Sequence, residues 1–472
     1  MNNPVLLITL PLLFAFLSVI FKSAKKVFMF SGLLINILLL NFIEKGSYLI
    51  GGWKIPYGIN LVLDNYSFAA VLIINTIFTI SVLMSYKSIK NMETVLLVSL
   101  AGLNGVVLTG DLFNLFVFLE IAGIGAYILS SSTGKHIASF KYLMLGTFGI
   151  NLFLFGIILF YSSTGSLNFI DIASKVSMMD NKLYLLAITM IFVGISVESK
   201  FMPFNSWAKE VYSNTDSLTA PIFAAVYASA MMFVFGRLFT SVFVTTGFIH
   251  NLLLFITIST FLFGEIIAFS EKKLRRMLTF SSVGQAGLIS TLFLVGAQYP
   301  AVMQIYNNAM SKMVMFSIAG YIAIKYGKDK IEDLQGVFLN NKILGFGFSA
   351  AALSIVGLPL FYGFYVKLNI LIEVFSKNVW LPALILFATL IEGIYYIRAL
   401  VKLWNPGKEG EVSKPSLAKL KLTDTFNYAF IAVIVAAIIV FLGLYPDVLA
   451  NFLNGTVESL KNYSGILTTG GM

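Results

Sequence analysis

Four ionisable residues lie inside long apolar stretches of this sequence. Glu120 is midway along FNLFVFLEIAGIGAYIL, and Lys200 ends an apolar run that begins at Leu183. Lys312 lies within NNAMSKMVMFSIAG, and Lys367 lies within GLPLFYGFYVKLN. A charge at the centre of a bilayer costs about 2.5–3.5 kcal/mol, so four isolated charges would cost on the order of 10–14 kcal/mol. We therefore expect these side chains to face one another, or water, inside a helical bundle.

Buried carboxylates and amines can form fixed ion pairs or pass ions. Glu120 and Lys200 alone would be compatible with a structural ion pair between helices. Three lysines and one glutamate cannot all pair, which favours a hydrated ion path. Lysine suits such a path because burial readily shifts a lysine's pKa, whereas arginine stays protonated.

Two of the lysines stand beside helix-breaking residues. Pro203 follows Lys200 by three positions, and Gly357-Leu358-Pro359 precedes Lys367. One charged, broken helix in each half of the chain, in mirrored order, is typical of inverted repeats with a pathway at the membrane midplane. Such breaks also expose backbone polar groups that water or ions can use.

The composition is that of a polytopic membrane protein. Of 472 residues, 58% are hydrophobic and 11% are charged, with a mean hydropathy of +0.89. Soluble proteins carry about 25% charged residues. Apolar runs of about 20 residues recur, and each can cross a hydrocarbon core of about 30 Å. We predict an all-α fold, because backbone exposed to lipid must satisfy its own hydrogen bonds.

The residue inventory predicts no cofactor, metal site or catalytic site. The chain has no cysteine, which excludes disulfides, cysteine-ligated iron–sulfur clusters and cysteine-based zinc sites. Its two histidines, His136 and His250, are too few for a chain of bis-histidine haems. The net charge of +10 does not indicate nucleic-acid binding, because the basic residues sit in short loops that set topology.

We predict about fourteen transmembrane helices, with helices seven and twelve broken. Basic residues gather in alternate loops, so the positive-inside rule places both termini outside the cytoplasm of a cell (inner) membrane. Residues 44–64 carry turn residues and β-formers and should form an external hairpin. The loop 162–182 should hold a short interfacial helix. The predicted spans are roughly 4–21, 27–43, 65–85, 94–109, 111–130, 137–161, 183–201, 218–242, 249–270, 275–296, 300–324, 341–375, 380–403 and 426–453.

Several stretches together resemble the antiporter-like subunits shared by respiratory NADH dehydrogenase, Mrp cation/proton antiporters and membrane-bound hydrogenases. TGDLFNLFVFLEI is similar to the fifth-helix motif whose glutamate is the family's key acid, here Glu120. SKFMPFNSWAKEVY resembles the family's broken-helix region and makes Lys200 its lysine. NNAMSKMVMF and GLPLFYGFYVK resemble the two C-terminal lysine motifs, here Lys312 and Lys367.

A further stretch, EKKLRRMLTFSSVGQAGLI, matches the family's basic turn and the helix start that follows it, with Ser281, Ser282 and Gln285. The resemblance covers roughly residues 60–405. It is nearest to the D-type Mrp subunit and its hydrogenase counterpart.

The resemblance implies a domain order and a set of roles. Residues 1–93 would hold helices one to three, and 406–472 a cytoplasmic loop and helix fourteen. Two inverted five-helix repeats would occupy 94–245 (helices four to eight) and 246–405 (helices nine to thirteen). Glu120 would control the charge of Lys200. Lys312 would be the central relay, and Lys367 the exit-side or inter-subunit relay.

Two departures from the family pattern affect the implied path. The eighth helix usually carries a lysine or histidine, and here Ser229 or Met231 is nearest that position, with Arg237 closer to the helix end. A histidine often precedes the central lysine by four residues, where this chain has Asn308. A proton path would need water there, held by Ser229, Tyr227 and Asn308.

Other polar residues have functional and structural interpretations. Glu392, deep in helix thirteen, could serve the ion entrance, and His136 could supply protons to the cytoplasmic side or be a solvated loop residue. Glu265 is expected to reach the cytoplasmic surface by snorkelling. Glu198, two residues before Lys200, is expected to face another way. Asp64 and Asp111 precede helices and are expected to be N-caps or surface acids.

The sequence thus predicts a proton- or cation-translocating subunit of a multisubunit energy-converting membrane complex. Its partners would be other membrane subunits, the lipid bilayer, and protons or sodium ions. Two alternatives remain open. One is a stand-alone secondary transporter, which would also place charges at broken helices. The other is a structural scaffold subunit with a degenerate ion path, which the missing eighth-helix charge supports.

Overall fold

Helices make up almost all the regular structure in the computed structural model, which describes residues 3–86, 91–132, 134, 136–215, 217–243, 245, 247–407 and 422–463. The first half contains α1 (Leu6–Ile20), η1 (Lys22–Ala24), α2 (Lys25–Leu39), β1 (Gly46–Leu49), β2 (Asn60–Leu63), α3 (Asn65–Met84), α4 (Glu93–Leu108), α5 (Leu112–Ser131), α6 (His136–Thr164), α7 (Phe169–Lys175), η3 (Val176–Met178), α8 (Asn181–Glu198), α9 (Ser206–Asn214), α10 (Thr219–Pro221), η4 (Ile222–Tyr227), α11 (Ala228–Arg237) and η5 (Leu238–Val242). The second half contains α12 (Gly247–Ser270), α13 (Leu274–Leu294), α14 (Gln298–Tyr326), η6 (Ile331–Leu334), η7 (Val337–Leu339), α15 (Lys342–Val356), α16 (Tyr362–Phe375), α17 (Leu381–Trp404), α18 (Leu422–Leu444) and α19 (Asp447–Lys461).

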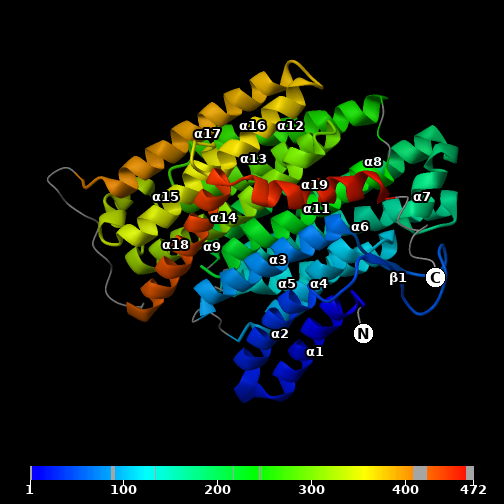
Figure 1. Cartoon of the computed structure of the whole chain (residues 1–472), viewed down its shortest axis with the longest axis horizontal. Helices are drawn as coiled ribbons and strands as arrows, with labels where there is room; N and C mark the ends of the chain where they lie inside the picture. The colour runs from blue at the N-terminus through cyan, green and yellow to red at the C-terminus, as the bar shows by residue number, and fades with distance from the viewer. Residues whose placement is uncertain are drawn as a thin grey trace.

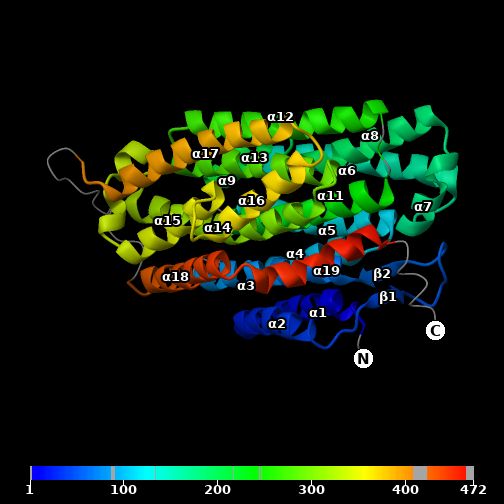
Figure 2. The ribbon, with the colours of Figure 1, turned by 45° about the horizontal axis from the view of Figure 1, so that its top comes forward.

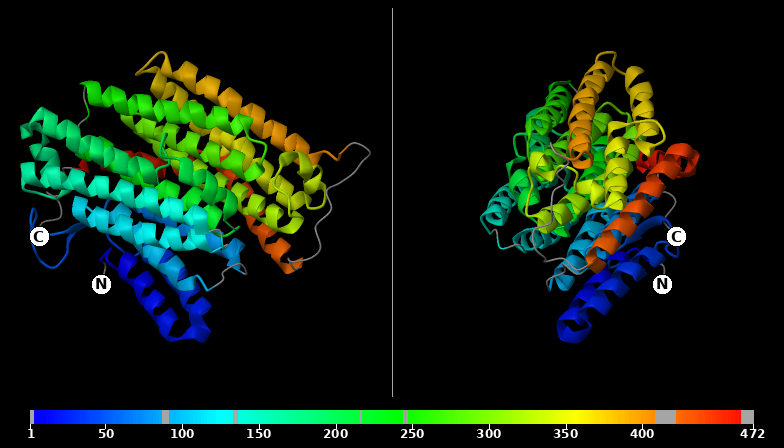
Figure 3. Two further views of the ribbon diagram at one scale, coloured as in Figure 1. Left: turned by 180° about the vertical axis from the view of Figure 1, so that it is seen from behind. Right: turned by 90° about the vertical axis from the view of Figure 1, so that its left-hand side faces the viewer.

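Most of the helices run roughly alongside one another in a single bundle (Figure 1). Among the described residues, nine helices are long and apolar enough to cross a membrane, or ten if the bent segment η6–α15 is one span. Figure 2 shows α1 and α2 along one edge, with α12 and α17 along the opposite edge. Seen from behind, α1 and α2 form a hairpin tilted against the other helices (Figure 3). The chain is therefore an all-helical, multi-pass membrane protein.

Three asparagines on α2, α3 and α4 connect the N-terminal hairpin to the bundle. Pro11 lies inside α1 and has no N–H to donate to the carbonyl of Leu7, one turn earlier. That carbonyl accepts hydrogen bonds from the amides of Asn104 (2.8 Å) and Asn36 (3.3 Å). Asn36 also donates to Asn75 (2.8 Å), which donates to Asn104 (2.8 Å). We call Asn36, Asn75 and Asn104 the amide cluster.

The centre of the bundle is formed by helices without a lipid-facing side. Residues 219–242 and 274–294 are apolar enough to span a membrane, and each contains an 18-residue stretch that is entirely buried. The 219–242 span contains two π-helical segments, η4 and η5, on either side of α11. The α12 and α13 backbones approach closely, since a Cβ on Gly264 would lie 2.5 Å from the Gly284 nitrogen. The polar side chains of these central helices therefore face other protein groups.

The helix breaks fall where the sequence places helix-breaking residues. Span seven stops at Glu198 and resumes as α9, and span twelve divides into α15 and α16. At the second break, Gly357 is left-handed (φ +84°), and the Ser354 hydroxyl oxygen accepts from the Gly363 N–H at 3.1 Å. A Cβ on Gly363 would overlap the Ser354 carbonyl, so only glycine fits this contact.

The predicted single helix at 426–453 is wrong. The chain forms α18 and α19, separated at Tyr445 and Pro446. Proline has no N–H for the helical ladder and disfavours helical geometry in the residue before it, which explains the break. The predicted hairpin is present as antiparallel β1 and β2, and α7 lies in the predicted loop 162–182. Most of the predicted cytoplasmic loop after residue 406 lies outside the described residues.

Candidate functional site

Lys200 is held in the gap between α8 and α9. The backbone leaves the helix after Ser199, and Lys200 has a left-handed conformation (φ +64°) that is unusual for a side chain with a Cβ. Its side chain is 1% exposed. The ammonium donates to the hydroxyls of Tyr212 (3.2 Å) and Ser282 (3.1 Å) and lies 5.3 Å from the centroid of the Tyr212 ring.

Glu198 shares a cavity with Lys200, although the sequence suggested that it would face another way. Regular helical geometry ends at Lys200, which has a left-handed backbone conformation. The side chains of residues 198 and 200 can therefore line the same cavity. The cavity has a volume of about 10 Å³, which is room for about one water. The Tyr142 hydroxyl donates to a carboxylate oxygen of Glu198 at 3.2 Å.

Lys312 is the next buried lysine of the site after Lys200, and it is also bound by hydroxyls. It is fully buried on α14 and donates to Ser281 (2.6 Å) and Tyr396 (2.9 Å). Ser281 and Ser282 are consecutive on α13, so one helix presents a hydroxyl to each lysine. Among the residues that the structure describes, neither Lys200 nor Lys312 forms a salt bridge with a carboxylate.

Lys367 differs, because it has a carboxylate partner. Its ammonium lies 2.6 Å from Glu392 of α17 and 3.3 Å from the Thr389 hydroxyl. Gln285 of α13 donates to the second oxygen of Glu392 at 2.8 Å and itself accepts from Gln304. The structure thus places Glu392, a candidate from the sequence, in contact with a lysine of the predicted relay.

Glu265 does not reach the surface, contrary to the snorkelling prediction. Its side chain is fully buried between α12 and α13, where Gly284 leaves room for it. One oxygen accepts from the Tyr395 hydroxyl at 2.7 Å, and the other has no hydrogen-bond partner in the described part of the chain. Lys312 lies within electrostatic range of both Glu265 and Glu392. Glu265 therefore belongs to the same buried layer.

We call this set the charged layer. It runs from α8 through α13 and α14 to α17 and alternates ionisable side chains with hydroxyls and amides. Its ionisable members are Glu198, Lys200, Glu265, Lys312, Lys367 and Glu392. Such a row can carry charge, because hydroxyls both donate and accept hydrogen bonds.

Glu120 lies apart from this layer. It is half-buried on α5, and no salt bridge joins it to Lys200 in the described structure. It lies within electrostatic range of Glu198, which lines the Lys200 cavity. Glu120 therefore does not control the charge of Lys200 through a direct salt bridge in the described structure.

The predicted water-holding residues occupy different settings. Tyr227 donates to the Ala122 carbonyl (2.8 Å), and Ser229 donates to the Ala225 carbonyl within its own helix (2.6 Å). Asn308 is buried, and its carbonyl oxygen has no partner among the described residues. His136 is exposed at the start of α6. Tyr227 also lines the Lys200 cavity, whereas Ser229, Asn308 and His136 are not part of its lining.

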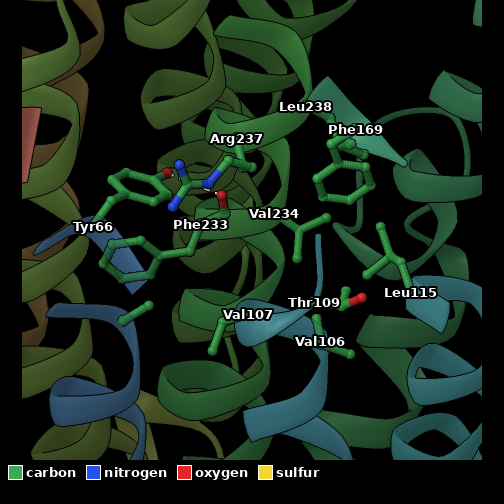
Figure 4. Close-up of a pocket in the computed structure, with 11 residues that line it drawn as sticks. Tyr66, Val106, Val107, Thr109, Leu115, Phe169, Phe233, Val234, Arg237 and Leu238 are labelled. Atoms are coloured by element: carbon green, nitrogen blue, oxygen red, sulfur yellow. Dashed lines mark hydrogen bonds between the residues drawn. The ribbon is translucent and has the colours of Figure 1, made fainter. Parts of the chain in front are cut away.

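At the eighth helix, four uncharged residues line the Lys200 cavity where the family resemblance implies a charge: Phe223, Tyr227, Ala228 and Met231. The arginine on this helix points elsewhere. Arg237 lies 2.8 Å from Asp64 of the β2–α3 corner, with its guanidinium over the rings of Tyr66 and Tyr463 (4.7 and 4.2 Å to the centroids). Figure 4 shows Arg237 and Tyr66 beside a small, mainly apolar cavity.

The two predicted N-caps are confirmed. Asp64 accepts from the Ser67 backbone N–H (2.7 Å) in a capping box that starts α3, and Asp111 accepts from the Asn114 N–H (2.8 Å) at the start of α5. Asp64 has a second role in its ion pair with Arg237. No group of acidic or histidine side chains that could hold a metal ion occurs in the described ranges.

Sequence reasoning did not identify the tyrosines of the charged layer or the true position of Glu265. Tyr142, Tyr212, Tyr395 and Tyr396 each contact an acid or a lysine of the layer. Aromatic residues are common at membrane interfaces, so their number hid these few. A usable signal was the sequence EGIYY at 392–396, which places two tyrosines on the same span as a buried acid.

Residues 109–392 match the family described as NADH:quinone oxidoreductase/Mrp antiporter, TM. The chain is 29% identical to NADH-quinone oxidoreductase subunit N of Desulforudis audaxviator, over 86% of this chain and 85% of the relative. It is 27% identical to the D-type subunit of the Na(+)/H(+) antiporter of Bacillus subtilis, over 98% of each.

A solved structure is similar over nearly the whole chain. A chain of the membrane-bound sulfane sulfur reductase, an archaeal respiratory membrane complex, superposes with a TM-score of 0.88 at 29% identity, covering 99% of both chains. All of these relatives and neighbours are subunits of larger membrane assemblies or carry subunit names.

Proposed function

We propose that this chain, which belongs to the NADH:quinone oxidoreductase/Mrp antiporter transmembrane family, translocates protons or sodium ions along its charged layer. It is an antiporter-like membrane subunit of the kind found in Mrp, complex I and sulfane sulfur reductase complexes. The proposal places ion movement in this chain and electron transfer, where it occurs, in partner subunits.

One observation carries this proposal: in the part of the chain that the structure describes, two buried lysines are bound by hydroxyls and not by carboxylates. Lys200 and Lys312 reach adjacent serines of α13 at 3.1 and 2.6 Å. A permanently charged ammonium in such a site would be costly, so a purely structural lysine should have an acid beside it. Hydroxyl partners accept a hydrogen bond from the ammonium and can donate one to the neutral amine. The site therefore suits a lysine that changes its charge.

The order of contacts suggests how a proton would move. Glu198 and Lys200 share the first cavity, and Ser282 and Ser281 stand between Lys200 and Lys312. Beyond Lys312, Glu265 and Glu392 provide negative charge, and Lys367 follows through its contact with Glu392. Protonation of one lysine would disfavour protonation of its neighbour, because like charges close together repel. Charge would then move stepwise along the layer.

The remaining roles and boundaries extend the proposal. Glu120 would act on the layer through Glu198, its electrostatic neighbour, and would not contact Lys200 directly. We further propose fourteen spans with both termini outside the cytoplasm. Two inverted repeats would occupy residues 94–245 and 246–405. Residues 1–93 would precede them, and residues 406–472 would follow them. The basic loop residues and the two charged helix breaks support this arrangement.

A second candidate function is a scaffold subunit with a degenerate path. The apolar lining of the Lys200 cavity at Met231 and Ala228 favours it, because no charge occupies the expected position on the eighth helix. In that case the lysines would stabilise the bundle without carrying ions.

The deciding experiment measures ion transport by the assembled complex in membrane vesicles. Lys200→Ala and Glu120→Ala should abolish proton or sodium uptake while the complex still assembles. Transport should be followed with pH-sensitive and sodium-sensitive probes, so that the ion is identified in the same assay. Unchanged transport in both variants would refute the relay and support the scaffold function.

A further inference from the structure

The second helix break, between α15 and α16, has an unusual backbone conformation. Leu360 is left-handed (φ +77°), a conformation that a residue with a Cβ rarely adopts, and Gly357 is left-handed at the end of α15 (φ +84°). A residue other than glycine persists in this conformation only where the surrounding contacts fix it. The contacts around the break therefore decide where α16 and its lysine lie.

The start of α16 depends on a hydroxyl from the other side of the break. The N-cap residue of α16 is Phe361, and its side chain makes no capping hydrogen bond. The Gly363 N–H donates instead to the hydroxyl oxygen of Ser354 on α15, at 3.1 Å. An N–H in the first turn has no partner within its own helix, so Ser354 supplies the cap that the N-cap residue does not.

Asn307 of α14 orients this hydroxyl. Asn307 is fully buried, and its side-chain oxygen accepts from the Ser354 O–H at 2.7 Å. The Asn307 amide nitrogen also lies 3.5 Å from the Ser354 carbonyl oxygen. Other serines inside helices, such as Ser196 and Ser229, donate to the carbonyl four residues earlier. Because Asn307 accepts the hydroxyl hydrogen, the Ser354 oxygen is free to accept from Gly363.

The side chain of Lys367 lies along the backbone that this contact holds. Lys367 is in the second turn of α16, and a Cβ on Gly357 would lie 2.7 Å from its Cδ atom. The lysine chain therefore crosses the end of α15 in close contact before its ammonium reaches Glu392 at 2.6 Å. α18 packs on the same break, where a Cβ on Gly443 would overlap the Leu360 carbonyl. The position of the ammonium thus follows the position of the break.

We infer that Asn307 is a positioning residue of the charged layer. Through Ser354 it fixes the start of α16, and this holds the Lys367 ammonium against its carboxylate partner. Lys312 is five residues further along α14, so the same contact ties Lys367 to the helix that carries Lys312. The inference rests on the proposed function only in counting Lys367 as part of the ion path.

A double-variant comparison on the assembled complex tests this role. Asn307→Ala removes the contact with Ser354, Glu392→Gln removes the carboxylate charge, and a third complex carries both changes. The measured quantity is the temperature at which half of this chain precipitates from the detergent-solubilised complex. If Asn307 acts on the Lys367–Glu392 pair, the combined shift should be smaller than the sum of the separate shifts, because the pair can be lost only once.

Two matched controls accompany the comparison. Asn307→Ala is also combined with Asp64→Asn, which removes a charge from a second buried ion pair and shares no partner with Asn307 in the described contacts, so these shifts should add. Ser317→Ala removes a buried hydroxyl of α14 that has no partner in the described part of the chain, and it should leave the temperature unchanged. Ser354→Ala should reproduce Asn307→Ala and replaces it if Asn307→Ala prevents assembly.

Transport by the same variants in vesicles separates the positioning role from the ion path. Asn307→Ala should lower ion transport by about fivefold, the loss expected for one hydrogen bond, and the combined variant should stay close to Glu392→Gln alone. Additive temperature shifts for Asn307→Ala with Glu392→Gln would overturn the positioning role, whatever Lys200→Ala does to transport. An equal departure from additivity with Asp64→Asn would also overturn it, because general loosening would then explain both. A departure confined to Glu392→Gln, with unchanged transport in Asn307→Ala and Lys200→Ala, would uphold the positioning role and refute the ion path.

Discussion

The amide cluster and the charged layer are both polar networks buried in one apolar bundle, but they are satisfied differently. In the amide cluster, neutral side chains bond to one another and to the Leu7 carbonyl left free by Pro11. In the charged layer, Lys200 and Lys312 bond to hydroxyls without a carboxylate partner in the described structure, and an oxygen of Glu265 has no partner there.

This difference separates two reasons for burying polar groups in a membrane. Neutral amides that bond to one another hold helices together, because each alternative would leave a polar group in hydrocarbon. Only the carbonyl oxygen of Asn36 lacks a partner in this cluster among the described residues, and that group carries no charge. Ionisable groups with incomplete partners are costly unless their charge can change. Burial of a polar residue is therefore a weak indication of function here, and the kind of partner is the stronger one.

The largest effect should come from removing a charge without a carboxylate partner. Lys312→Ala should lower ion transport by about 100-fold or more, because loss of a positioned proton carrier costs at least that much in other proton-transfer systems. Vesicle transport assays on the assembled complex would measure it. Lys325→Ala is the matched control, because Lys325 lies on the same helix near its end and bonds only to Tyr321 in the described contacts. Similar losses in both variants would contradict the assignment.

Loss of a charge from a buried ion pair should affect stability and not transport, as is also expected for the amide cluster. Asp64→Ala should destabilise the protein by about 3–5 kcal/mol, because it leaves Arg237 buried without its partner. Asp64→Asn keeps the N-cap of α3 and isolates the cost of the lost charge. Denaturant unfolding would measure both, and transport per assembled complex should be unchanged. A transport defect greater than the loss of assembled complex would place this pair in the ion path.

The amide cluster itself should affect stability alone. Asn75→Ala removes the acceptor of Asn36 and a donor to Asn104, and we expect a loss of about 1–2 kcal/mol. Unfolding of the purified protein in detergent would measure it, with the exposed Asn41→Ala as the control. If Asn75→Ala abolished transport in fully assembled complex, the contrast between the two networks would fail.

The smallest effect should come from the paired end of the charged layer. Glu392→Gln keeps a hydrogen-bonding group beside Gln285 and Lys367 but removes the negative charge. Because Lys367 retains some access to solvent, we expect transport to fall by only about fivefold, corresponding to roughly 1 kcal/mol. A transport rate equal to that of the native complex would exclude Glu392 from the path.

Much of the fold could be predicted from the sequence, because membrane crossing imposes long apolar runs. The helix breaks at Pro203 and at Gly357–Pro359 were predicted, and so were the N-caps at Asp64 and Asp111. The break at Pro446 was missed because the apolar character continues across it, and hydropathy does not report on backbone hydrogen bonds.

The site was only partly predictable. Lys200, Lys312 and Lys367 stood out because charges in apolar runs are rare. Glu265 looked accessible because it lies near a helix end, and only the packing of α12 against Gly284 shows that it is buried. Glu198 was assigned another direction by helical geometry, which ceases to apply at the left-handed Lys200. Partners from distant helices, such as Tyr396 for Lys312, leave no local pattern.

The π-helical segment η4 has a consequence for how the eighth helix is compared among relatives. A π turn accommodates one residue more than an α-turn of the same length, and a deletion there would restore the regular helix. Every side chain from Ala228 to Arg237 would then rotate by roughly 100° about the helix axis. A relative without this insertion presents a different residue to the Lys200 cavity at the same aligned position. The apolar face at Met231 and the direction of Arg237 toward Asp64 thus both depend on a single residue of helical register.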